Sequence, residues 1–187
     1  MEKKSSPSNS RESVPAREKK RSQLKLTMQY ATRMPGIPAR PAFRKWVNAA
    51  LTRDAEIVLR IVDEAEGRKL NRDFRGRDYA TNVLTFVYAD AQSEIQSATR
   101  PAVDDAPPLT GDIVLCAPVI ENEATQQHKN LPAHYAHLTV HGVLHLQGHD
   151  HENDPDAAVM EQLEIEILGR LGYQNPYDQH QPATESH

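Results

Sequence analysis

The sequence has one cysteine, few aromatic residues and no long hydrophobic run. Because Cys116 is alone, an internal disulfide and a cysteine-based zinc cluster are excluded, so any metal site would use His, Asp or Glu side chains. No run of about 18 apolar residues is present, and no apolar segment follows the charged N-terminus. These absences argue against a transmembrane helix and a secretory signal, and they predict a cytoplasmic protein without a membrane partner. The length of 187 residues suits one domain.

Charge is divided unevenly along the chain. Residues 1–78 contain 19 Lys and Arg against 10 Asp and Glu, whereas residues 79–187 contain 3 against 16. The net charge of -4 therefore hides a basic half and an acidic half. This asymmetry fits a basic surface that binds phosphate, and it fits ordinary solvated charge equally well.

Composition divides the chain into a central domain and two tails. Residues 1–22 contain no Leu, Ile, Phe, Tyr or Trp and are rich in Ser, Pro, Lys and Arg, which predicts a disordered basic tail. Residues 23–177 form the predicted domain. Within it, residues 90–110 are acidic and contain proline, and we predict a mobile loop there. Residues 178–187 are predicted to be a disordered C-terminal tail.

Hydrophobic periodicity predicts both strands and helices in the domain. The predicted strands are 24–28, 57–62, 82–88 and 112–116. The predicted helices are 42–51, 64–74, 118–128, one from Pro132 through His145 that stops at Gly148, and one that Asp154 and Pro155 cap and Gly172 ends. We therefore expect an α+β fold: a single three-layer α/β/α domain with a mostly mixed four-stranded sheet.

Six of the nine histidines lie between His134 and His151, which points to a metal site. His141 and His145 are four residues apart in a predicted helix, so both project from one face. Gly148 ends that helix and lets His151 return as a third ligand. Three imidazoles with an open fourth position are typical of catalytic zinc, although they also suit nickel, copper and iron.

The spacing of these residues matches the zinc-binding motif of the metzincin proteases. In those proteases a Glu follows the first His and acts as general base, whereas Gly142 occupies that place here. A metallopeptidase-like hydrolase is therefore an alternative that lacks its usual base.

Three further residues are candidates for supporting roles. His137 continues the stripe of His141 and His145; it either lines the cleft or, with His134, has a hydrogen-bonded or solvent-facing structural role. Asp150 either orients a ligand imidazole or shapes the turn. His149 is expected to point elsewhere.

The segment from His141 to His151, HGVLHLQGHDH, resembles the HGxLHLxGxDH signature of the YbeY family. Members of that family are metal-dependent endoribonucleases of bacterial ribosomal RNA maturation and quality control. The resemblance continues through residues 70–78, 81–86, 111–116 and 171–173, and it covers residues 24–177. The departures are Ala80, Thr85 and His149, where the family commonly has Pro, Ser and Tyr.

The resemblance implies a site and an activity. It implies that His141, His145 and His151 hold one Zn²⁺ per chain and that Arg75 is the active-site arginine. An ion pair of Arg75 with Asp73 or Asp78 is the structural alternative. The implied activity is zinc-dependent, single-strand-specific endoribonuclease cleavage in 16S rRNA 3'-end maturation and ribosome quality control.

The resemblance also implies the partners of the protein. They are single-stranded RNA, rRNA precursors, the small ribosomal subunit and its assembly factors, and DNA is not expected. Because aromatic residues are only 5% of the chain, backbone contacts are expected to outweigh base recognition. His137, Asp112 and solvent are unranked candidates for the general acid. A non-catalytic ribosome-assembly factor with a structural metal is a further alternative.

Overall fold

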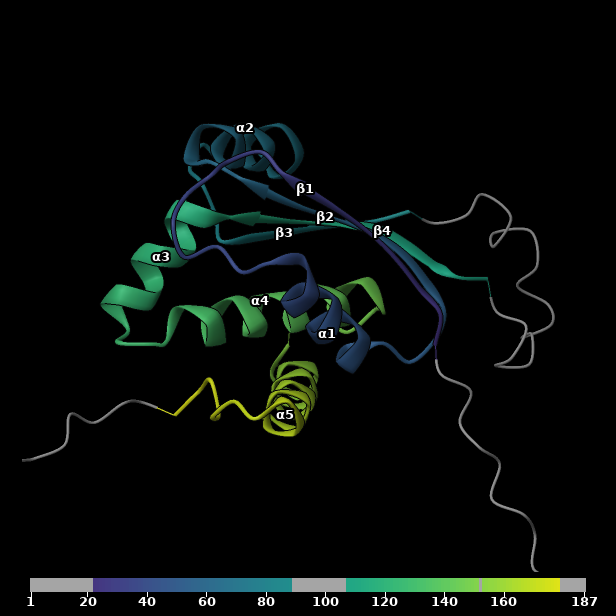
Figure 1. Cartoon of the computed structure of the whole chain (residues 1–187). Helices are drawn as coiled ribbons and strands as arrows, with labels where there is room; N and C mark the ends of the chain where they lie inside the picture. Colours follow the sequence, from purple (N-terminus) through teal and green to yellow (C-terminus); the bar gives the residue numbers. More distant parts are fainter. Residues whose placement is uncertain (1–21, 89–106, 152, 179–187) are drawn as a thin grey trace, which may run out of the picture.

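The computed structural model describes residues 22–88, 107–151 and 153–178, which form four strands and five helices (Figure 1). The strands are β1 (Leu24–Tyr30), β2 (Ala55–Val62), β3 (Val83–Val87) and β4 (Leu109–Cys116). The helices are α1 (Arg40–Ala50), α2 (Glu64–Arg75), α3 (Ala117–Gln126), α4 (Leu131–Leu146) and α5 (Asp154–Leu171). Every predicted strand and helix is present, and the α+β fold is confirmed.

The sheet is mixed, with the strand order β1-β2-β4-β3. β1 pairs with β2 and β2 with β4 in parallel, whereas β3 runs antiparallel to β4. Four side chains of β2 are fully buried, as expected for a parallel strand covered on both faces: Ile57, Leu59, Ile61 and Val62. β3 lies at one edge, so the loop that precedes it can reach from one face of the sheet towards the other.

Helices cover both faces of this sheet (Figure 1). α2 lies on one face, while α1 and α4 pack against the other. α5 packs against α4 and α1 on the side away from the sheet. α4 is therefore enclosed between β4 and α5, and side chains from most of its circumference are buried. Among the residues described, no helix is long and apolar enough to cross a membrane.

Local sequence signals explain where the two C-terminal helices begin and end. The side chain of Asn130 accepts a hydrogen bond from Ala133 N at the start of α4, and Gly148, with φ of 89°, reverses the chain after it. α5 begins after Asn153, whose side chain accepts from Asp156 N. The N-cap is thus one residue earlier than the predicted Asp154. Gly172, with φ of 88°, ends α5 as predicted.

The largest boundary difference is at β4. This strand begins at Leu109, three residues before its predicted start, so the last residues of the expected loop 90–110 belong to the sheet. Leu109 pairs with Ala55, and its N–H donates to Asp54 O at 2.8 Å. Pairing with β2 extends the strand through residues whose local sequence indicates a loop. The predicted tails, except at Ser22 and Asp178, and residues 90–106 of that loop lie outside the described residues and stay predictions.

Candidate metal centre and its cavity

Three imidazoles converge where α4 ends. His141 and His145 lie one turn apart on α4, and His151 returns from the loop that follows Gly148. The Nε2 atoms of His141 and His145 are 3.0 Å apart, and one ring nitrogen of each of the three lies within 4.8 Å of the others. Two nitrogens on a tetrahedral zinc ion lie about 3.3 Å apart. The three imidazoles could therefore hold a metal ion.

A buried carboxylate on α5 orients one of these imidazoles. Glu164 is fully buried, and its Oε1 accepts from His141 Nδ1 at 2.7 Å. Its Oε2 accepts from His137 Nε2 at 2.8 Å and from the Tyr177 hydroxyl. Because the carboxylate accepts, Nδ1 of His141 is the donor; in the neutral form of this imidazole, Nε2, which faces His145, then carries the lone pair that can bind a metal.

Sequence analysis did not identify Glu164. The available signal was a charged residue four positions after Met160, within the apolar stripe of α5 that also contains Ile167 and Leu168. Burial by itself raises the pKa of Glu164, but hydrogen bonds from His137 and His141 lower it to about 2. The carboxylate is therefore charged at neutral pH.

The protonation of His145 also suits metal binding. Burial, followed by the neighbouring His141 and His151, lowers the pKa of His145 to about 4. At pH 7 this imidazole is neutral, which is the form that coordinates a metal.

The imidazoles open onto a cavity of about 590 Å³. On its other side the cavity is bounded by the end of α2, the loop after it and β3. The residues that line it are Arg75, Arg77, Thr81, Asn82, Val83, Thr85, His141, His145, Asp150 and His151. α2 ends at Gly76, with φ of 68°, and this turn leads the chain from one face of the sheet to the cavity.

Ion pairs near α2 distinguish the arginines of the cavity from their neighbours. Asp78 accepts from Arg68 Nε at 2.8 Å and Nη2 at 2.7 Å, and Lys69 binds Asp73. Among the described residues, Arg75 and Arg77 form no ion pair, so the alternative pairing of Arg75 with Asp73 or Asp78 is not observed. The two arginines that line the cavity keep their positive charge available.

Two of the predicted candidates lie away from the cavity lining. His137 is bound to Glu164, and Asp112 accepts from the Tyr88 hydroxyl at 2.7 Å. His134 has a structural role, because it is 4% exposed and hydrogen-bonds to Glu123 Oε2 at 2.8 Å. Asn82 donates to the same carboxylate at 3.0 and 3.1 Å, which fixes its place in the cavity wall.

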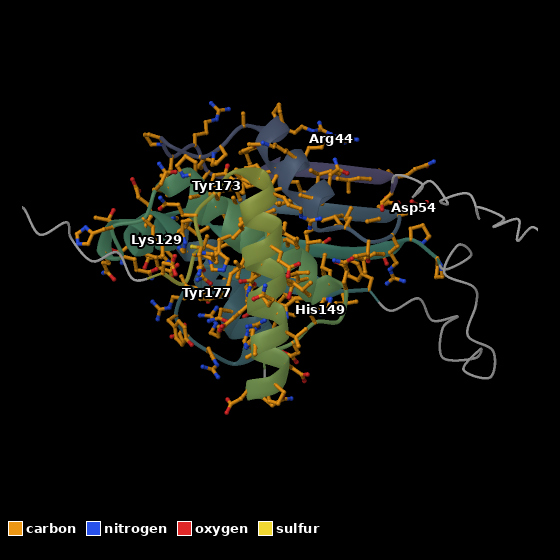
Figure 2. All side chains as sticks on the ribbon, turned by 90° about the horizontal axis from the view of Figure 1, so that it is seen from below. Arg44, Asp54, Lys129, His149, Tyr173 and Tyr177 are labelled. Carbon is orange, nitrogen blue, oxygen red and sulfur yellow. The ribbon has the colours of Figure 1, made fainter. Side chains whose placement is uncertain are left out.

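Asp150 lines the cavity and shapes the turn. Its Oδ1 accepts from His151 N at 2.7 Å, while the carboxylate that contacts a candidate ligand imidazole belongs to Glu164. His149 does not line the cavity; from below, it and Tyr177 project on opposite sides of α5 (Figure 2).

Gly142 is closely packed against the sheet. A Cβ atom added at Gly142 would lie 3.0 Å from Ile113 Cγ2 and 3.3 Å from Ile113 Cδ1. The position that carries the general base in metzincin proteases therefore faces β4 here, and a glutamate there would meet Ile113.

Several known proteins are similar to this chain. The family model described as Endoribonuclease YbeY matches residues 35–172. A protein of Nitrosospira multiformis named Endoribonuclease YbeY is 63% identical over 88% of this chain and 87% of its own length. A Nitrosomonas europaea protein of the same name is 61% identical over 83% and 85%. A solution structure from Thermotoga maritima aligns with a TM-score of 0.48 at 21% identity, covering 88% of this chain and 100% of that chain. The family model and the two curated relatives show that the chain belongs to the YbeY endoribonuclease family.

Proposed function

We propose that this protein is a zinc-dependent endoribonuclease that cleaves single-stranded RNA, with His141, His145 and His151 as metal ligands and Arg75 as the phosphate-binding residue. The observation that carries the proposal is that these four side chains line one cavity. Membership of the YbeY endoribonuclease family supports the phosphodiester bond as the substrate.

Each side chain of the site has a separate role in phosphodiester hydrolysis. When bound, zinc acts as a Lewis acid, which lowers the pKa of water and offsets the negative charge of the phosphate. The guanidinium of Arg75 donates to the non-bridging phosphate oxygens, where negative charge grows as the bond breaks. Glu164 keeps His141 in the tautomer whose Nε2 can bind the metal. His137 and Asp112 are engaged by Glu164 and Tyr88, so we assign protonation of the leaving oxygen to solvent.

In the cell we propose that the protein acts on rRNA precursors in the cytoplasm, in maturation of the 16S rRNA 3' end and in ribosome quality control. It would meet its substrate on the small ribosomal subunit, together with assembly factors. The name Endoribonuclease YbeY of the relatives supports RNA as the substrate. The resemblance of residues 141–151 to the family signature is the basis for the ribosomal role. The excess of Lys and Arg in residues 1–78 favours contact with RNA phosphates.

The test combines metal analysis with RNA cleavage. Wild type, Arg75→Ala and His145→Ala are compared on a single-stranded and a duplex rRNA fragment. Arg170→Ala is the control, because Arg170 is an exposed arginine of α5 that does not line the cavity. We expect one zinc per chain and cleavage of the single strand in wild type and Arg170→Ala. Both site variants should lose cleavage, but only His145→Ala should lose metal.

Two outcomes would overturn the proposal. Cleavage of casein by the zinc-loaded protein, with RNA left intact, would favour the metallopeptidase alternative. A metal-loaded protein that binds RNA without cutting it, and that unfolds when the metal is removed, would favour the assembly factor with a structural metal.

A further inference from the structure

One wall of the cavity is the segment between α2 and β3, residues 76–82, and it carries an exposed aromatic ring. Tyr79 is 52% exposed, and its hydroxyl accepts from Nη1 of Arg77 at 3.1 Å. Arg77 lines the cavity, so the ring of Tyr79 lies beside the cavity lining.

The backbone beneath this ring is anchored to α2. Asn71 is 1% exposed, and its Nδ2 donates to Tyr79 O at 2.7 Å. Arg77 N donates to Asn71 O at 3.4 Å, so a buried residue of α2 holds both ends of the Arg77–Tyr79 segment. An exposed ring on an anchored backbone loses little conformational freedom when it binds a flat ligand.

The surroundings of this ring favour an anionic ligand with a flat face. Arg68 neutralises the carboxylate of Asp78 between Arg77 and Tyr79, so the net charge at this edge of the cavity comes from Arg75 and Arg77. The neighbouring exposed ring of Phe74 packs edge-on against Phe86, with centroids 4.9 Å apart. In the part of the chain that the structure describes, the ring of Tyr79 has no such aromatic partner.

We propose that Arg77 and Tyr79 form a nucleotide-binding subsite beside the metal centre, where one base of a single strand stacks on Tyr79 and Arg77 holds the adjacent phosphate. The proposal rests on the proposed RNA substrate and adds a residue that recognises its single-stranded form. Every base has a face that can stack, whereas in a duplex both faces are covered by neighbouring bases. The subsite therefore selects single strands without selecting a sequence.

The test is binding of a fluorescent 2'-O-methyl oligoribonucleotide to the zinc-loaded protein at fixed salt, with gel analysis to establish that the strand stays intact. We expect Tyr79→Ala to weaken binding about 10-fold, within the range known for loss of one base–aromatic stack. Tyr79→Phe keeps the ring and should bind within about twofold of wild type. Tyr30→Ala removes an exposed ring from β1, at the opposite edge of the sheet, and should bind like wild type. Melting curves establish that each variant is folded.

An abasic series identifies the stacked base. Removing the base at one position should weaken binding to wild type as much as Tyr79→Ala does, and on that strand Tyr79→Ala should cause no further loss. Equal binding by wild type and Tyr79→Ala, or a loss that persists on every abasic strand, would overturn the subsite. If wild type itself neither binds nor cleaves single-stranded RNA, the proposed function fails first; if it does both while Tyr79→Ala matches it, only the subsite fails.

Discussion

Replacing Glu164 with glutamine tests whether this buried carboxylate prepares His141 to bind a metal. Glu164 is fully buried and accepts from His141 Nδ1 on one oxygen, and from His137 Nε2 and the Tyr177 hydroxyl on the other. Glutamine has the same shape, but its amide has one oxygen that accepts and one NH₂ group that donates. If the NH₂ group faces His141, Nδ1 of His141 must accept that hydrogen bond, so the ring proton lies on Nε2 and Nε2 cannot bind a metal.

The magnitude follows from the contacts that are lost. Loss of a carboxylate that orients a metal-binding histidine typically weakens metal affinity about 10- to 100-fold. In addition, at least one of the imidazoles loses a charge-assisted hydrogen bond in a buried site, which costs about 1–3 kcal/mol of folding stability. We expect both effects in Glu164→Gln.

The assay is competition for zinc against a chromophoric chelator, together with NMR of the metal-free protein to determine which nitrogen of His141 carries the proton. Tyr177→Phe is the matched control, because it removes one donor to Glu164 Oε2 and leaves the bond to His141 in place. It should change zinc affinity less than about threefold, whereas the carboxylate change costs at least about tenfold. Wild-type zinc affinity and an unchanged His141 tautomer in Glu164→Gln would refute the reasoning.

Three further predictions concern the scaffold and the metal. Gly111→Ala should destabilise the fold by about 2 kcal/mol or more, because its Cβ would lie 2.6 Å from Phe86 O. Gly169→Ala, at an exposed position of α5 with open space around it, should stabilise the fold by about 1 kcal/mol; denaturant unfolding measures both. Burial raises the pKa of Glu123, but hydrogen bonds from His134 and Asn82 lower it below its usual value. The contribution of Glu123 to the free energy of unfolding is thus complete above the unfolded pKa of about 4.3 and is lost as pH falls below that value. Glu123→Gln should therefore make the free energy of unfolding, measured with urea from pH 3 to 7, fall less steeply at acid pH. An unchanged slope at acid pH would contradict this. Chelation should abolish RNA cleavage and lower the melting temperature while far-UV circular dichroism at 25 °C stays native, because the metal centre lies outside the apolar core.

Much of the fold and the centre of the site could be predicted because their causes are local. Apolar residues at strand or helix spacing mark most of the elements, since these must bury one face, and Pro and Gly mark helix ends. His141 and His145 share a helix face by spacing alone, and Gly148, at a φ that glycine adopts readily, turns the chain so that His151 returns. The element ends are less predictable, as the early start of β4 shows, because pairing with β2 overrides the local loop signal.

The sequence by itself determined the elements of this protein and the three imidazoles, because helix spacing and a glycine turn act over about ten residues. Only the tertiary structure decided which distant side chains join them. Packing of α5 on α4 brings Glu164 to His141 across 23 positions, and the edge position of β3 brings Arg77 to the same cavity as Arg75, which the family resemblance had implied. Spatial neighbours far apart in sequence leave no periodic pattern, so these contacts depend on how helices and sheet pack.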